Sequence, residues 1–66
     1  MEVLSNGEAL DVPEGSTVDD LLRQLGLGAK WVLVERNGEP VLRSELARTV
    51  LQPGDRLELV RAVAGG

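Results

Sequence analysis

The sequence contains neither cysteine nor histidine. Without cysteine, the chain has no disulfide bond, no thiolate nucleophile and no cysteine ligand for a metal. Without histidine, it lacks the side chain that most often serves as a general base and most often binds metals. We therefore expect no thiol or imidazole chemistry and no metal site built from these residues.

Aromatic residues and positive charges are also scarce. Trp31 is the sole aromatic residue, and the formal net charge is −4 at pH 7. A single aromatic side chain cannot build a surface on which bases stack, and a negatively charged chain is poorly suited to neutralising phosphates. We expect no nucleic-acid partner.

Long hydrophobic runs are absent as well. The longest is Trp31–Val34, far shorter than a membrane span, and the first residues do not follow the pattern of a signal peptide. We therefore expect no membrane partner and a cytoplasmic location. A length of 66 residues allows one domain with a single small core, here built from valine, leucine and alanine.

The first segment of the chain, MEVLSNGEALDV, predicts a β-hairpin. Val3 and Leu4 precede Asn6-Gly7, which is a strong signal for a tight turn, and Leu10 and Val12 follow with an alternating pattern. Pro13 and Gly15 then end the second strand.

A helix is predicted over the segment TVDDLLRQLGL, which begins at Thr17. Thr17 or Ser16 caps the N-terminus, and Asp19 and Asp20 place negative charge in the first turn, where the helix dipole favours it. Gly26 suits the left-handed position after the last turn, in a Schellman motif that brings Leu22 and Leu27 together. Four residues form the expected apolar stripe: Val18, Leu21, Leu22 and Leu25.

The second half of the chain predicts further strands. The segment KWVLVERNGE, from Lys30, reads as a third strand that leads into a second turn at Asn37-Gly38. Its apolar residues are continuous, which indicates a strand inside a sheet or one with an apolar outer face. Pro40 and the irregular pattern after it indicate a short extended piece and then one helical or 3₁₀ turn around residues 44–47.

The last predicted strand follows a type II turn at Pro53-Gly54. The segment RLELV alternates, with Leu57 and Leu59 on one face and Val60 on the other. Together these elements predict a two-layer α+β domain in which the helix covers one face of a sheet. The strand residues expected to face the helix are Val3, Leu10, Val12, Val34, Leu57 and Leu59.

The same parity places Leu33 and Val60 on the opposite face of the sheet. Two interpretations stay open for these residues. Isolated exposed aliphatic side chains are common on protein surfaces, and exposed apolar residues also form partner surfaces.

The printed sequence ends in RAVAGG. After Arg61 come five small or apolar residues, which if extended reach about 17 Å at about 3.3 Å each. Such a segment can pass through a narrow opening in a partner, and glycines without Cβ atoms leave the last carbonyl open to attack. We expect a folded domain over residues 1–61 and a flexible tail over residues 62–66.

Four stretches together resemble the ThiS family, the sulfur carrier proteins of thiamine biosynthesis. They are TVDDLLRQLGL, VERNGEPVLRSEL, LQPGDRLELV and RAVAGG. The resemblance covers essentially all 66 residues in the same order, and it includes the total length. The resemblance implies the β-grasp fold shared with ubiquitin, a mixed sheet with one main helix across one face. In that fold the first and last strands lie side by side and parallel.

The resemblance also implies a reaction at Gly66. A ThiF-type enzyme with ATP and Mg²⁺ adenylates the carboxyl group of Gly66, and sulfur from a donor linked to a cysteine desulfurase displaces AMP to leave a thiocarboxylate. Thiazole synthase (ThiG) then accepts the sulfur. The chain itself binds no cofactor. Gly65 provides steric clearance, and the residues that thread into the partner are Arg61, Ala62, Val63 and Ala64.

Other functions and residue roles also stay open. The chain is alternatively a sulfur carrier for molybdopterin or tRNA thiolation, a ubiquitin-like modifier conjugated to lysine through Gly66, or a passive interaction domain. Asp19 and Asp20 point about 100° apart on a helix, so dipole complementation explains them better than a paired acid–base site. Trp31 is interpreted as packing at the edge of the core, with a binding role as the alternative. Arg61 either pairs with an acidic groove of the activating enzyme or keeps the end of the strand hydrated.

Overall fold

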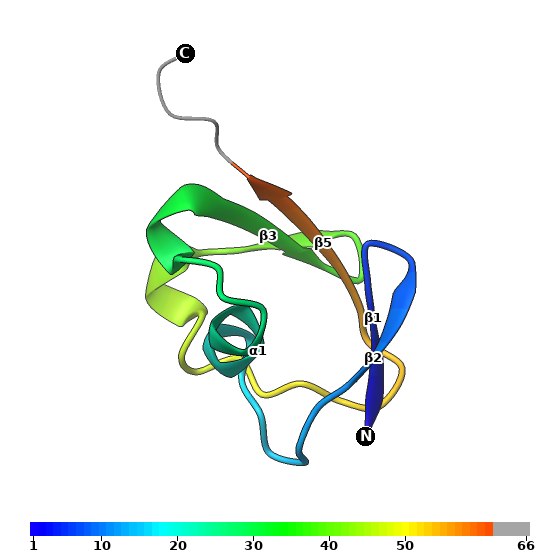
Figure 1. Cartoon of the computed structure of the whole chain (residues 1–66). Coiled ribbons are helices and arrows are strands. Elements are labelled where there is room, and N and C mark those ends of the chain that lie inside the picture. The colour runs from blue at the N-terminus through cyan, green and yellow to red at the C-terminus, as the bar shows by residue number, and fades with distance from the viewer. Residues whose placement is uncertain (62–66) are drawn as a thin grey trace.

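The computed structural model describes residues 1–61, which form a five-stranded mixed sheet with one α-helix across one face (Figure 1). The strands are β1 (Glu2–Ser5), β2 (Glu8–Asp11), β3 (Val32–Arg36), β4 (Glu39–Val41) and β5 (Arg56–Arg61). The helices are α1 (Val18–Gln24) and two 3₁₀ turns, η1 (Ala29–Trp31) and η2 (Arg43–Glu45). The predicted two-layer α+β fold is confirmed, and residues 62–66 lie outside the described part of the chain.

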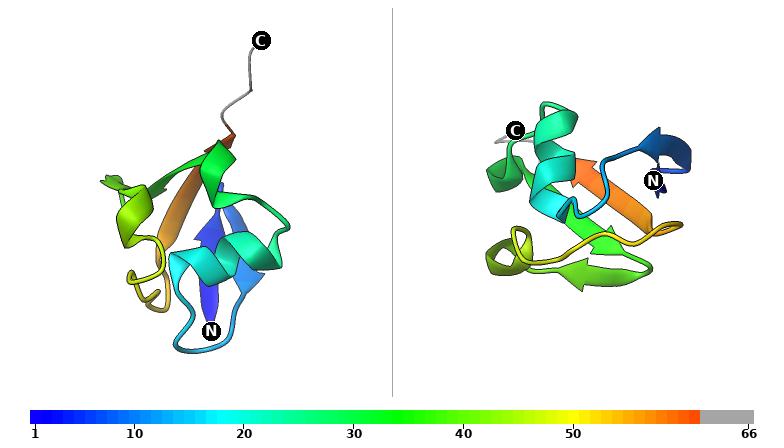
Figure 2. Two further views of the ribbon diagram at one scale, coloured as in Figure 1. Left: turned by 90° about the vertical axis from the view of Figure 1, so that its left-hand side faces the viewer. Right: turned by 90° about the horizontal axis from the view of Figure 1, so that it is seen from below.

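Strand β5 occupies the centre of the sheet, whose order is β2-β1-β5-β3-β4. It pairs in parallel with β1 and antiparallel with β3. The expected side-by-side arrangement of the first and last strands is therefore confirmed. Figure 2 shows β5 running between its neighbours toward the end of the molecule opposite to the N-terminus.

The two Asn-Gly turns attach β5 to the sheet from both sides. Asn6 and Asn37 both have positive φ angles, as the turn signal predicts. The Asn6 side chain donates to the Leu59 carbonyl (3.2 Å) and accepts from the Leu59 N–H (2.8 Å). The Asn37 side chain accepts from the Arg56 N–H at 2.9 Å. Each turn thus closes its own hairpin and also holds the last strand.

Both ends of α1 are satisfied as the sequence predicts. Thr17 and Asp20 form a capping box in which each side chain accepts from the other's backbone N–H, at 3.1 and 2.9 Å. At the other end, the Gly26 N–H donates to the Arg23 carbonyl and the Leu27 N–H to the Leu22 carbonyl, which is the Schellman pattern.

The core lies between α1 and the sheet. The strand residues predicted to face the helix do so, with Leu10 and Leu59 partly buried at its margin. Two further leucines, Leu46 and Leu51, are at most 4% exposed, and the sequence analysis assigned neither to the core. The buried apolar residues are Val3, Val12, Val18, Leu21, Leu22, Val32, Val34, Leu46, Leu51 and Leu57.

Leu46 and Leu51 are buried because the segment between them crosses the start of α1. The Val18 and Asp19 N–H groups, which have no partner inside the helix, donate to the carbonyls of Thr49 and Leu46 at 3.0 Å each. This segment appears in yellow beneath the helix in Figure 1.

The structure corrects two expectations from the sequence. Leu25 was predicted on the buried stripe, but α1 ends at Gln24, and Leu25 is the C-cap residue with 38% of its surface exposed. Trp31 was predicted at the start of a strand and at the edge of the core. It instead ends η1, because β3 begins at Val32, and it is 51% exposed.

Asp55 is a buried carboxylate, 6% exposed, that joins the β3–β4 turn to the start of β5. It accepts from the Arg36 Nε (2.8 Å), the Asn37 amide (3.0 Å) and the Gln52 backbone N–H (2.8 Å). Burial alone raises the pKa of Asp55, but these hydrogen bonds and the Arg36 charge outweigh burial and lower the pKa below its ordinary value. Asp55 is therefore ionised and fully bonded in the folded state.

Of the helices in residues 1–61, none has the length and apolar character needed to cross a bilayer.

We expect the substitution Asp55→Asn to lower the free energy of unfolding by about 2–3 kcal/mol at neutral pH. Arg36 loses the negative charge that it pairs with, and an amide NH₂ donor is buried where a carboxylate oxygen accepts hydrogen bonds. Since the folded-state pKa is lowered, this contribution is fully present above the unfolded pKa of about 3.9 and is lost as the pH falls through the folded value. Urea denaturation of both proteins between about pH 2 and pH 7 measures this difference.

The matched control is Glu39→Gln, because Glu39 is exposed and forms no ion pair within the described residues. Equal stability of the Asp55→Asn variant and the parent protein at pH 7 would contradict the assigned role of Asp55.

Candidate functional site

The candidate site is the C-terminal end of β5 together with the sheet face that α1 does not cover. At this end, Arg61 lies opposite Val32 of β3, and its side chain is exposed. Five residues assigned to the reactive tail, Ala62, Val63, Ala64, Gly65 and Gly66, lie outside the described residues, and their roles stay predictions.

Leu33 and Val60 lie directly opposite each other on β3 and β5. They are 64% and 57% exposed, so the predicted outward direction of both side chains is confirmed. Val60 immediately precedes Arg61, which places this apolar pair next to the point where the chain continues toward Gly66. The pair is too exposed to contribute much to the core.

A shallow hollow of about 390 Å³ continues the apolar surface from Leu33 toward β4 and η2. Leu42, which is 66% exposed, lies on its rim. We call Leu33, Val60 and Leu42 the apolar patch. The hollow is lined by Val32, Leu33, Val34, Glu35, Pro40, Val41, Leu42, Arg43 and Leu46.

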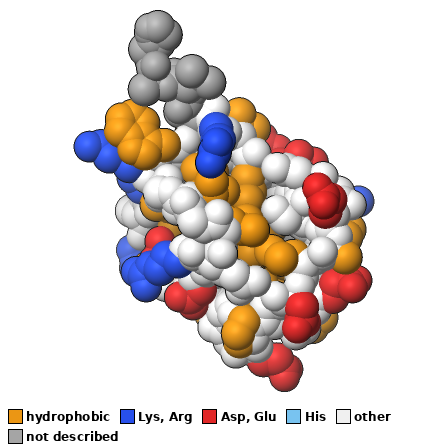
Figure 3. All heavy atoms as spheres, in the orientation of Figure 1, with side chains coloured by type: hydrophobic (Ala, Val, Ile, Leu, Met, Phe, Trp, Pro, Cys, Tyr) orange, Lys and Arg blue, Asp and Glu red, His pale blue; other side chains and the backbone are white. Residues whose placement is uncertain are grey.

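Positive charge lies beside this end of the sheet. The Lys30 Nζ is 5.5 Å from the centre of the Trp31 ring, within the range of a cation–π contact. The Arg43 Nη2 donates to the Lys30 carbonyl at 3.2 Å. In Figure 3, basic side chains gather at the upper left of the molecule, whereas most of the visible acidic ones lie on the right and lower parts.

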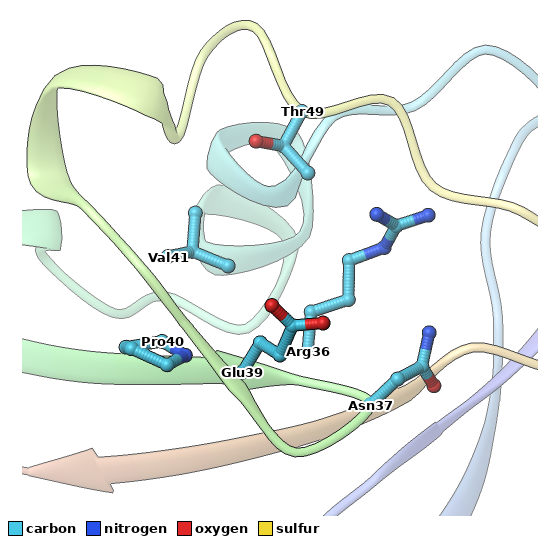
Figure 4. A pocket seen from close by; sticks show the side chains of 6 residues that line it. All are labelled: Arg36, Asn37, Glu39, Pro40, Val41 and Thr49. Atoms are coloured by element: carbon cyan, nitrogen blue, oxygen red, sulfur yellow. The ribbon is translucent and has the colours of Figure 1, made fainter.

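A second hollow, of about 250 Å³, lies between the β3–β4 hairpin and Thr49 (Figure 4). Three of its polar side chains, those of Arg36, Asn37 and Thr49, already have structural partners. Arg36 is bound to Asp55, and the Thr49 hydroxyl donates to the Glu45 carbonyl at 2.8 Å. We assign it no ligand. Residues 1–61 also contain no cluster of three or more His, Cys, Asp or Glu residues placed to hold a metal ion.

The adjacent acids Asp19 and Asp20 have separate structural roles. Asp19 forms an ion pair with Arg23 at 2.8 Å, one turn further along α1. Hydrogen bonds from the Thr17 backbone and side chain lower the pKa of Asp20. Their interpretation as helix-end residues rather than an acid–base pair agrees with these contacts.

The sequence analysis missed Leu42 as a surface residue and gave Asn6 and Asn37 no role beyond their turns. Leu42 lies in the irregular stretch after β4, where no alternation indicates a direction. The partners of Asn6 lie 53 residues away in the sequence, so no local pattern reveals them.

Comparison with known proteins shows what the chain resembles. The model of the ThiS family matches residues 1–66. The chain is 33% identical over 66 residues to the sulfur carrier protein ThiS of Escherichia coli (strain K12), and the match covers 100% of both chains. The crystal structure of the thiamine biosynthesis protein ThiS from Geobacter metallireducens matches with a TM-score of 0.84 and 33% identity, over 100% of both chains.

The chain is also 39% identical over 66 residues to a thiazole synthase of Paramagnetospirillum magneticum (strain ATCC 700264 / AMB-1). This match covers 100% of the chain but spans 20% of the length of that synthase.

The assignment of the two sheet faces makes a prediction about stability. We expect Val60→Asp to lower the free energy of unfolding by no more than about 1 kcal/mol, because the side chain is exposed and only strand propensity is lost. Leu57→Ala, three residues earlier on the buried face, is expected to lower it by about 2–5 kcal/mol. Chemical denaturation measures both values, and the opposite ranking would reverse the face assignment.

Proposed function

The chain belongs to the ThiS family, and on that premise we propose that it is a sulfur carrier of thiamine biosynthesis that bears sulfur on the carboxyl group of Gly66. The observation that carries this proposal is the end-to-end correspondence with the sulfur carrier protein ThiS of Escherichia coli, in which both chains are covered completely. The fold match over the full length of a second ThiS protein supports it.

The chemistry explains why such a carrier needs an enzyme. A free α-carboxyl group has a pKa of about 3.5 and is ionised at neutral pH, so it is a poor acyl donor. A ThiF-type partner uses ATP and Mg²⁺: a carboxylate oxygen of Gly66 attacks the α-phosphorus, and pyrophosphate leaves. A persulfide of the sulfur donor then attacks the activated carbonyl, and AMP leaves. A thiol cleaves the resulting acyl disulfide and is itself oxidised to a disulfide. The product is a thiocarboxylate on Gly66.

The described residues support a role as a protein substrate in this reaction. The chain has no cysteine or histidine, and the reaction requires neither from it, because the partner supplies ATP, Mg²⁺ and the catalytic groups. The partner binds the folded domain, and Leu33 and Val60 are contact residues in that complex. Arg61 through Ala64 thread into the partner, and Gly65 lets the partner's backbone close around the chain.

Thiazole synthase is the acceptor that we propose. A stretch similar to this chain makes up 20% of the Paramagnetospirillum magneticum thiazole synthase. Joining two modules in one polypeptide raises their effective concentration for each other, which fits a carrier that delivers to that enzyme. The sulfur source is a donor linked to a cysteine desulfurase, and the cytoplasm is the location that we propose for the whole sequence of reactions.

Intact-mass measurement tests this function directly. After incubation with the adenylating enzyme, ATP, Mg²⁺ and a sulfur donor, we expect the mass of the chain to rise by the difference between one sulfur and one oxygen atom. Fragmentation should place the change on Gly66. A control chain with one alanine added after Gly66 should keep its mass, and a branched conjugate to lysine would instead support the protein modifier.

Deleting Gly65 and Gly66 separates folding from function. We expect the truncated chain to unfold cooperatively within about 0.5 kcal/mol of the parent protein, because the core residues found within residues 1–61 all lie between Val3 and Leu57. The same truncation should abolish the mass increase. A large loss of stability, measured by urea denaturation, would show that the tail belongs to the folded domain.

A further inference from the structure

The open face of the sheet carries an acidic pair next to the apolar patch. Glu35 and Glu58 lie directly opposite each other on β3 and β5, two residues along each strand from Leu33 and Val60. Both glutamates are exposed. Since side chains alternate along a strand, the two glutamates share the outward face with Leu33 and Val60.

Sheet stability does not explain this pair. Like charges directly opposite each other on neighbouring strands are destabilising, and glutamate is depleted in strands. Within residues 1–61, no lysine, arginine or N-terminal amine lies within 4.0 Å of either carboxylate. Arg56, on the same face and two residues before Glu58, is the nearest cation along β5 and forms no ion pair there.

We propose that Glu35 and Glu58 together bind an arginine of the adenylating enzyme, while Leu33 and Val60 make the adjoining apolar contact. This inference rests on the proposed function. Opposite residues of an antiparallel pair have Cβ atoms about 4.5–5.5 Å apart. A guanidinium group, with five N–H donors in one plane, can bond two carboxylates at that spacing.

The position of the surface favours an enzyme that acts on Gly66. Val60 is the last residue before Arg61, and the five residues from there to Gly66 reach at most about 17 Å. A protein that holds Gly66 in its reaction centre therefore contacts the body close to this face.

Charge favours the adenylating enzyme among the partners. A cleft that binds the triphosphate of ATP needs positive side chains, and such a cleft attracts a carrier of net charge −4. Pairing between opposite charges at the rim of an interface fixes the orientation of docking and speeds association. The acidic pair thus fixes the direction in which the chain enters the enzyme.

The test is the double substitution Glu35→Gln with Glu58→Gln, which removes two charges and keeps side-chain size. The assay follows pyrophosphate release by the adenylating enzyme at increasing carrier concentration and at several salt concentrations. We expect KM for the carrier to rise about tenfold with a smaller salt dependence, and kcat to stay unchanged. The melting temperature should rise by about 2–4 °C, because the like-charge repulsion is gone.

The matched control is Glu8→Gln with Glu14→Gln, which changes the net charge equally. Glu8 and Glu14 are exposed, lie away from the patch and form no ion pair, so KM should change less than about twofold in this control. An equal rise in KM for both double variants would show that the change in net charge alone raises KM, and it would overturn the proposal. An unchanged KM for the Glu35/Glu58 variant would overturn it as well.

Affinity for thiazole synthase is measured with the same variants. A loss confined to the synthase would assign the face to that enzyme and contradict our choice of partner. If the unsubstituted carrier releases no pyrophosphate at all, the proposed function fails and this inference fails with it. If the carrier is adenylated normally and the variant behaves identically, the inference alone fails.

Discussion

The structure depends on the placement of the last strand between two others. β5 pairs with β1 at Arg56 and Leu57 and with β3 from Leu57 to Arg61, so the strand has a neighbour on each side. Asn6 and Asn37 add side-chain hydrogen bonds from the two turns that flank it. A strand paired in this way holds Arg61 in a defined position relative to the folded domain. In the function that we propose, this pairing fixes where the chain leaves the folded domain.

The two faces of the sheet have different roles. One stabilises the fold, and we propose that the other contacts partners. One face packs against α1 through a small aliphatic core, supported by the segment between Leu46 and Leu51 that crosses the helix start. A chain of this size buries only about 60% of its unfolded surface, so polar contacts such as those of Asp55 add to a limited core. The other face keeps Leu33 and Val60 exposed, together with an opposed pair of glutamates, and the exposed Leu42 lines the same hollow as Leu33. These residues do little for folding, which is why we assign them to contacts with partners.

The lack of cysteine and histidine fits the proposal that partner enzymes supply the catalytic groups. The carrier function that we propose needs a reactive chain end and a surface that partners bind, and the exposed Leu33 and Val60 are the candidates for that surface. A stretch similar to this chain also makes up 20% of the length of a thiazole synthase of Paramagnetospirillum magneticum.

The sequence by itself determined the features that depend on neighbouring residues. The two Asn-Gly turns, the Thr17 cap, the Schellman end at Gly26 and the alternation in β5 follow from backbone preferences over a few residues. The outward direction of Leu33 and Val60 followed from strand parity, and the family followed from a pattern spread over the whole chain. Only the tertiary structure decided which distant groups meet. Asp55 and Leu51 looked like ordinary loop residues, Asn6 looked like a turn residue alone, and Glu35 and Glu58 became a pair only once the β3–β5 register was known. The physical reason is that burial, cross-strand pairing and charge contacts depend on separations in space, which local propensities do not encode.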